Sequence, residues 1–293
     1  MKLYTFQAEN RVRLGLEVRS QLIDLSAGYA ALVATRGKTA GGPRDLPGEM
    51  LAFLGMGDPA WAAAQQVAQF FSKRPALPVG ERIQFLFDEV QWLPPVLRPG
   101  KIICQSAPTP SPTPTLPGEE SSRASVHEPK YFSKFASTLV GHNAQVICRG
   151  AFKTLRLQPG VAAVIGRTLQ NVSANDALRC VAGYSWFIDI SKDASSGGAA
   201  EWLLAKNADT FCAMGPRLVT PDEFKHSPAD FETRLGQALE EISAQLTLEP
   251  GDVVSVHTGR GNFDAATGQA TFDHPDLGSI ALSIAAWPDS SEG

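Results

Sequence analysis

The sequence lacks the features that mark several large classes of protein. Its four cysteines form no C-x-x-C pair, which argues against zinc ribbons and dithiol redox motifs. No apolar run approaches the roughly 20 residues that span a bilayer, and residues 1–15 have no apolar core of a secretory signal. Lys and Arg are not clustered and the net charge is −4, so a nucleic-acid groove is not indicated. We therefore expect a cytoplasmic protein with reduced thiols, without membrane or nucleic-acid partners.

Several catalytic signatures are missing as well. The sequence contains no Gly-x-Ser-x-Gly elbow, no phosphate-binding loop and no dinucleotide fingerprint. What it does contain is ordinary for a globular protein: 293 residues, 43% of them hydrophobic and 19% charged. That length predicts one large domain or two modest ones.

Residues 1–97 alternate between strand and helix patterns. Three short runs of period-two alternation fall within residues 2–25, and helical spacing follows in residues 27–34, 50–54 and 61–71. Residues 83–87 alternate again, and Pro94-Pro95 and Pro99-Gly100 mark a boundary. We expect a small α/β domain over residues 1–97 and a second domain over residues 98–293.

The second domain is organised around residues 161–216. Apolar runs at 161–165 and 184–190 predict buried strands, and Asn175 or Asp176 is placed to cap a short helix between them. Asp189 is an acid inside the second run. Because a buried unpaired carboxylate costs several kcal/mol or must take up a proton, Asp189 requires a partner. Lys206 can supply the opposite charge, and we expect the two to lie on neighbouring strands or strand ends.

These residues resemble the core of the fumarylacetoacetate hydrolase family. The matching segments share order and spacing with that family, and weaker matches extend over most of the chain; the main ones are Ala163–Gly166, Gly183–Ser191, Lys206, Asp209–Phe211, Gly215-Pro216, Pro99–Cys104 and the Pro129…Phe132…Lys134 segment. The resemblance implies an α+β fold, in which a β-rich roll of mixed strands follows a small N-terminal α/β domain. It also implies a homodimer that acts on a small molecule.

The chain departs from that family at its metal ligands and lid. Relatives carry two glutamates and an aspartate that bind Mg²⁺, whereas the matching positions here are Gln158, Gly160 and Asp189. One carboxylate and one amide make a poor cage for Mg²⁺, so we expect no metal cofactor, although Mg²⁺ stays as the disfavoured alternative. Relatives also carry a His–Glu base pair on a helical lid. Here Pro108–Pro114 alternates proline and threonine, which favours an exposed non-helical linker or, as the alternative, a ligand for a partner protein.

A third departure lies between residues 224 and 246. Relatives have a long β-hairpin there, but apolar residues at spacings of three and four predict a helix instead. After the next strand, Thr258 matches a threonine that holds a substrate carboxylate in relatives. His257 stands beside it, where glycine is usual.

The candidate site therefore combines residues that match the family with residues, such as His257, that do not. We assign catalysis to Lys206, His257 and Asp189, and substrate binding to Lys134, Thr258, Ser137 and Tyr184. Lys206 can act as a base, stabilise an enolate or simply pair with Asp189, while His257 is either a general base or a loop residue.

Three functions remain open on these residues. The first is a metal-independent lyase, isomerase or cyclase for an enolisable dicarbonyl or polyketide-like compound. The second is a non-catalytic subunit or small-molecule binder on the same scaffold. The third is a metal-dependent C–C bond hydrolase or decarboxylase with substitute ligands. Because fold does not decide function, the site must discriminate among them.

Overall fold

The structure, a computed structural model, describes residues 1–37, 42–73, 75, 82–106, 130–148, 154–192, 199–258, 263–265 and 267–286, with only the backbone of residues 199–201. The predicted linker Pro108–Pro114 and the loop Gly259–Gly261 lie outside these residues.

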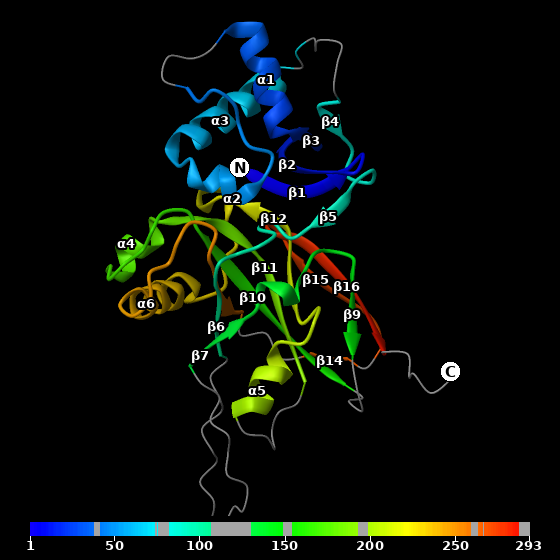
Figure 1. Cartoon of the computed structure of the whole chain (residues 1–293), viewed down its shortest axis with the longest axis vertical. Helices are drawn as coiled ribbons and strands as arrows, with labels where there is room; N and C mark the ends of the chain where they lie inside the picture. Colours follow the sequence, from blue (N-terminus) through cyan, green and yellow to red (C-terminus); the bar gives the residue numbers. More distant parts are fainter. Residues whose placement is uncertain are drawn as a thin grey trace, which may run out of the picture.

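The N-terminal part is a curled antiparallel sheet with three helices on one side (Figure 1). Its elements are β1 (Lys2–Ala8), β2 (Arg11–Val18), β3 (Gln21–Asp24), α1 (Leu25–Arg36), α2 (Met50–Gly55), α3 (Asp58–Ser72), β4 (Gln84–Phe85) and β5 (Gln91–Leu93). The Asp24 carboxylate ends β3 and caps α1 by accepting a hydrogen bond from the Ala27 amide at 3.0 Å. The predicted strand at 83–87 forms over two residues only.

The rest of the chain is mainly strands with short helices between them. Its elements are β6 (Ile102–Gln105), β7 (Tyr131–Lys134), the 3₁₀ turn η1 (Ala136–Thr138), β8 (Leu139–Val140), β9 (Ala144–Cys148), β10 (Leu155–Ile165), α4 (Ala174–Leu178), β11 (Val181–Ser191), α5 (Ala199–Lys206), β12 (Cys212–Val219), the 3₁₀ turn η2 (Pro221–Glu223), α6 (Phe231–Ser243), β13 (Val253–His257), β14 (Phe263–Ala265), β15 (Gly268–His274) and β16 (Gly278–Ala286). Parallel and antiparallel pairs both occur, so the fold is α+β with a mixed, strand-rich second part.

One sheet crosses both parts of the chain. Its strand order is β4-β3-β2-β1-β12-β11-β10-β13-β6-β7, and β1 pairs with β12 through Lys2↔Val219 and Leu3↔Leu218. The expected division at residue 97 therefore stays a proposal about folding units, because backbone hydrogen bonds join the two sides.

The sheet curls back on itself in the second part. β7 lies four places from β11 in the strand order, yet Lys134 on β7 reaches Asp189 on β11 at 2.6 Å. β8, which follows β7 in the chain, pairs with β12 in parallel. The curl brings β7 to the inner face of β11, and α5 lies at the end of this roll away from α1–α3 (Figure 1).

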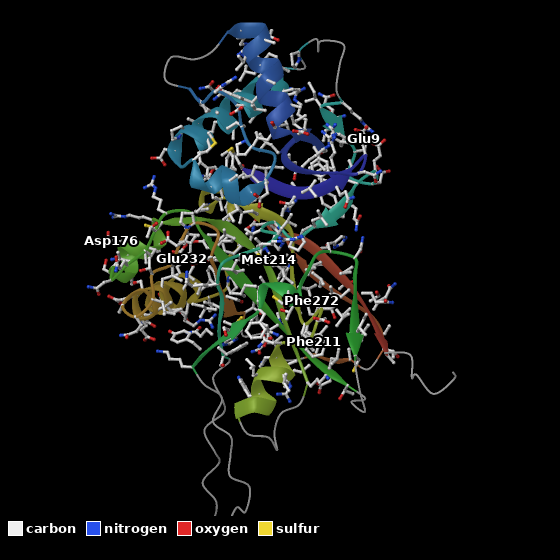
Figure 2. All side chains as sticks on the ribbon, viewed as in Figure 1. Glu9, Asp176, Phe211, Met214, Glu232 and Phe272 are labelled. Atoms are coloured by element: carbon white, nitrogen blue, oxygen red, sulfur yellow. The ribbon has the colours of Figure 1, made fainter. Side chains whose placement is uncertain are left out.

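The two faces of the curled sheet are buried against different partners. Tyr184, Trp186 and Ile188 of β11 pack in a cluster with α6, whereas Phe187 packs in a second cluster with the N-terminal helices. Phe211 and Met214 lie inside the molecule and Asp176 at its periphery (Figure 2). This alternation follows from the two-residue repeat of a strand and puts Asp189 on the same face as Phe187.

Two local predictions have different outcomes. The helix expected within residues 224–246 is confirmed as α6, whose buried residues recur at spacings of three and four. The predicted cap of α4 was wrong: Ser173, not Asn175 or Asp176, is the N-cap, and its hydroxyl accepts a hydrogen bond from the Asp176 amide at 3.3 Å. Asp176 instead accepts a hydrogen bond from the Ser173 hydroxyl, so it supports the cap from the third helical position.

Candidate active site

Asp189 is the buried anion of the roll. Every residue of β11 is buried, and Asp189 is 5% exposed. Its Oδ1 lies 2.6 Å from the Lys134 ammonium and its Oδ2 accepts a hydrogen bond from Lys206 Nζ at 2.7 Å. Burial alone would raise the pKa of this carboxyl, but the two ammonium charges outweigh it and hold the pKa below its ordinary value. Asp189 is therefore an ionised, doubly paired carboxylate.

All three N–H donors of the Lys134 ammonium are already in use. Its side chain has no exposed surface, and Nζ donates to the carbonyl oxygens of Ile190, Lys206 and Phe211 at 2.6–2.7 Å. The Asp189 contact is an ion pair in addition to these three hydrogen bonds. Because an ammonium has three donors, none is left for a ligand. This geometry favours a positioning role for Lys134 over the expected contact with substrate.

Lys206 has fewer partners than Lys134. It lies in the last turn of α5, so the expectation of a strand position was wrong, while the expected ion pair with Asp189 is confirmed. The other neighbours of Nζ are two aromatic rings, with centroids 4.5 Å away in Phe132 and 5.2 Å away in Trp202. Asp189 Oδ2 is its only hydrogen-bond acceptor among the described residues. Lys206 thus keeps donor capacity beside an aromatic wall.

Trp202 contributes a buried donor to the same place. Its indole Nε1 is buried and has no acceptor among the residues that the structure describes. Because a buried N–H without a partner is costly, such a group is often completed by a ligand or an ordered water. The cluster of Asp189, Lys134 and Lys206 carries a net charge of +1, so an acceptor with negative charge would suit it.

Two buried thiols complete the polar surroundings. Burial raises the pKa of Cys104 well above its usual range and that of Cys212 to about 12. Both thiols therefore stay neutral and leave the charge of the cluster unchanged. No disulfide is present among the four cysteines.

The residues at the family's metal position do not fit a divalent cation. Gln158 is paired in register with Asp189, and Gly160 follows on the same strand face. A Cβ added to Gly160 would lie 2.9 Å from Ser255 Oγ and 3.0 Å from the Val256 carbonyl oxygen, so any side chain there would require these neighbours to shift. The carboxylate of Asp189 already faces two ammonium groups, which would repel a metal. Within the described ranges, no group of three His, Cys, Asp or Glu residues is arranged to hold a metal.

β13 ends at His257 beside this position, and Thr258 follows it. His257 is paired in register with Gly160, and the Thr258 amide and hydroxyl both donate to the Pro159 carbonyl oxygen, at 3.1 and 3.2 Å. Arg234 of α6 donates to the His257 carbonyl oxygen at 3.0 Å and lies 3.4 Å from its Nε2. Burial first, and then the Arg234 charge, lowers the pKa of His257. The imidazole is therefore neutral near pH 7 and able to accept a proton.

The structure does not bring Ser137 and Tyr184 into this group. Ser137 is exposed in η1. Tyr184 is packed against Phe224 and Phe231 on the opposite sheet face from Asp189, and burial raises its pKa to about 12. Neither placement supports the substrate contact that the sequence suggested.

Sequence reasoning missed Trp202 and Arg234 as site residues. Trp202 lies one helical turn before Lys206, so the i, i+4 spacing would have placed the two side chains together if this segment had been predicted as a helix rather than a strand. Arg234 gave no comparable signal, since its contact depends on how α6 crosses β13.

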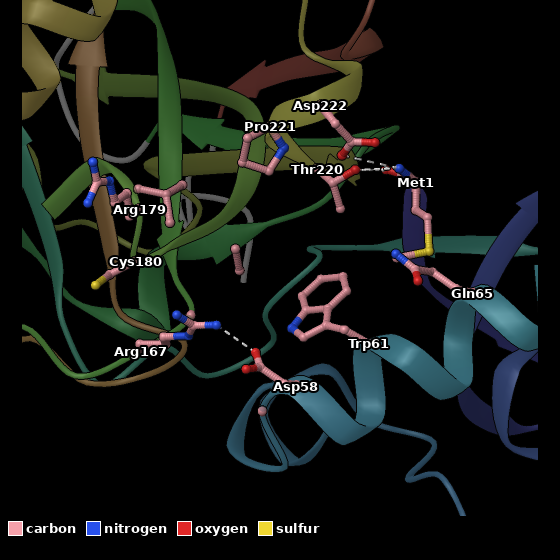
Figure 3. Close-up of a pocket in the computed structure, with 14 residues that line it drawn as sticks. Met1, Asp58, Trp61, Gln65, Arg167, Arg179, Cys180, Thr220, Pro221 and Asp222 are labelled. Atoms are coloured by element: carbon pink, nitrogen blue, oxygen red, sulfur yellow. Dashed lines mark hydrogen bonds and ion pairs between the residues drawn. The ribbon is translucent and has the colours of Figure 1, made fainter. Parts of the chain in front are cut away.

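A separate cavity lies between α3 and the roll (Figure 3). It measures about 240 Å³ and is lined among others by Trp61, Gln65, Arg167 and Arg179. Arg167 is already bound to Asp58 at 2.6 Å. None of the sequence-predicted site residues lines this cavity, so we place the candidate chemistry at the Asp189 cluster.

Known proteins similar to this chain agree on one family. A sequence model described as fumarylacetoacetate (FAA) hydrolase C-terminal matches residues 116–237. The oxaloacetate tautomerase Fahd2a, mitochondrial, of Rattus norvegicus is 32% identical over 181 residues, which are 60% of this chain and 52% of that protein. The corresponding human protein is 32% identical over 190 residues, with the same coverage of 60% and 52%. The chain spans about half the length of these curated relatives.

Solved structures extend the likeness to the whole fold. Maleylpyruvate hydrolase from Sphingobium sp. SYK-6 has a TM-score of 0.69 and 20% identity, covering 98% of this chain and 100% of that one. The same enzyme has been solved with manganese(II) and pyruvate. A 2-hydroxyhepta-2,4-diene-1,7-dioate isomerase from Mycobacterium marinum has a TM-score of 0.64 and 20% identity, covering 98% and 99%. Taken together, the match over residues 116–237, the curated relatives and the shared fold support membership of the fumarylacetoacetate hydrolase family.

Proposed function

We propose that this protein is an enzyme that removes a proton from the carbon next to the ketone of a small 2-oxo acid. The reaction is keto–enol tautomerisation or a related isomerisation, and it uses no divalent metal. The observation that carries the proposal is the buried Asp189–Lys134–Lys206 cluster with its surplus positive charge. The names of the relatives, oxaloacetate tautomerase and 2-hydroxyhepta-2,4-diene-1,7-dioate isomerase, support this substrate class.

In this proposal Lys206 provides the charge that relatives obtain from a metal. Removing a proton next to a ketone creates an enolate, and a preorganised cation beside the developing oxyanion lowers the barrier. The Lys206 ammonium retains donors for that oxygen, and the buried indole N–H of Trp202 would donate to a second oxygen of the substrate. Lys134 keeps Asp189 ionised, so the ammonium of Lys206 stays fixed in place.

The base in this proposal is the neutral imidazole of His257. Its lowered pKa keeps it neutral near pH 7, and β13 lies next to the strand of Gln158 and two strands from Asp189. Thr258 would bind the substrate carboxylate.

We further propose that the protein is a cytoplasmic homodimer. Light scattering on the purified protein would test whether it is a dimer.

The test is solvent exchange at carbon 3 of oxaloacetate or pyruvate, followed by proton NMR in D₂O. Lys206→Ala should slow the exchange by roughly 10² to 10³, the usual loss for an oxyanion donor. Lys130→Arg is the matched control, because Lys130 is an exposed lysine paired with Glu241. Full activity in Lys206→Ala would refute the assignment.

A non-catalytic binder is the second candidate. The neutral residues Gln158 and Gly160 at the family's metal position favour it. It predicts that a 2-oxo acid binds, as measured by calorimetry, but that its protons exchange no faster than in buffer.

A further inference from the structure

Lys206 differs from Lys134 in a way that bears on covalent chemistry. Asp189 needs one counter-charge and has two. Lys134 donates to three carbonyl oxygens and is ion-paired with Asp189. If it lost a proton, one of those buried carbonyl oxygens would lose its hydrogen-bond donor. Lys206 makes a single hydrogen bond among the described residues, so it can give up a proton while Asp189 keeps its other cation.

We propose that the Lys206 amine forms a Schiff base with the carbonyl carbon of the 2-oxo acid, an inference that rests on the function proposed above. A protonated imine withdraws electrons from the neighbouring carbon as a bound metal would, and it thereby acidifies the hydrogen there. The imine would thus supply the electron withdrawal that a bound metal ion would give, and Gln158 and Gly160 cannot hold such an ion.

The reaction balances without any further reagent. One proton of the Lys206 ammonium passes transiently to Asp189, and the free amine adds to the carbonyl carbon as the C=O π bond breaks. The proton that the adding nitrogen then loses passes to the carbonyl oxygen. The resulting carbinolamine loses its hydroxyl as water, with the proton returned by Asp189, and leaves an iminium. The overall change is ammonium plus ketone to iminium plus water, so the site keeps the same charge before and after.

The surroundings of Lys206 suit that iminium. Asp189 Oδ2, 2.7 Å from Nζ, is both the proton acceptor and the counter-ion. The rings of Phe132 and Trp202 lie within 5.2 Å of Nζ and stabilise a delocalised cation through their faces. The buried Trp202 Nε1–H has no acceptor among the described residues and can donate to the carboxylate next to the imine carbon.

Borohydride trapping tests the proposal directly. The intact protein is incubated with pyruvate or oxaloacetate, sodium borohydride is added to reduce any iminium to a stable amine, and the adduct is located by peptide mass spectrometry. We expect one adduct, on Lys206. Lys206→Arg keeps the positive charge but cannot form an imine, so its adduct should disappear, whereas Lys130→Arg should label as the wild type does.

Each result is decisive when solvent exchange is measured on the same samples. Exchange that depends on Lys206 without any adduct would overturn the Schiff base and leave the proposed function standing. Adducts on Lys130 or scattered over several lysines, or an undiminished adduct in Lys206→Arg, would also overturn it. Neither exchange nor adduct would refute both proposals. Since the site of labelling is mapped on the wild-type chain, the result does not depend on the folding of a variant.

Discussion

Replacing Asp189 by Asn should destabilise the fold strongly, because it removes the carboxylate that pairs with both cations of a buried group. Breaking a buried ion pair by removing one partner costs about 3–5 kcal/mol. A Coulomb estimate agrees: two unit charges about 5 Å apart repel by about 3 kcal/mol at an effective dielectric constant of about 20. We expect a loss of about 3 kcal/mol, since Lys134 keeps its three carbonyl acceptors.

Equilibrium urea unfolding of the wild type, Asp189→Asn and the double variant Asp189→Asn/Lys206→Met measures this loss. The double variant removes the second cation, so it should recover a substantial part of the lost stability and the two changes should not add. A loss below about 1 kcal/mol in Asp189→Asn, or a double variant less stable than the single one, would contradict the reasoning about buried charge.

The same variant has a predictable pH dependence. The pKa of Asp189 is lowered in the folded protein, so its carboxylate stabilises the fold at pH values above the ordinary pKa of 3.8. That contribution is lost as the pH falls through the folded pKa. The difference in unfolding free energy between the wild type and Asp189→Asn should therefore be constant at neutral pH and shrink below pH 3.8.

The remaining predictions concern the metal position and α6. Elemental analysis of the purified protein should find Mg, Mn and Ca below stoichiometric amounts, and EDTA should leave activity unchanged; a stoichiometric metal would contradict the fit argued above. Gly160→Glu should lower stability by roughly 1–3 kcal/mol through crowding against Ser255, and Ser255→Gly should relieve part of that loss in thermal unfolding. Arg234→Gln should raise the pKa of His257 and so shift the acidic limb of kcat/KM to higher pH, whereas an unmoved limb would remove His257 as the base.

Local sequence patterns predicted the secondary structure correctly where one pattern dominated. Alternation and apolar runs predicted β11 and β13, and spacings of three and four predicted α6, because these patterns report directly which side of an element is buried. The Asp189–Lys206 ion pair was predictable as well, since a carboxylate inside an apolar strand has to find a cation. The cap of α4 was not, because Ser173, Asn175 and Asp176 all have the chemistry of a cap and only the chain path selects one.

Which charges meet, and which ammonium has all its donors in use, depends on how the elements pack together. Lys134 is far from Asp189 in the sequence, and the curl of the sheet, a property of several strands together, brings it to the carboxylate and surrounds it with three carbonyl oxygens. Tyr184 matched a candidate position, yet its place on the opposite face of β11 separates it from Asp189. Trp202 and Arg234 entered the site through the packing of α5 and α6, since contacts between elements depend on crossing geometry that no local pattern encodes.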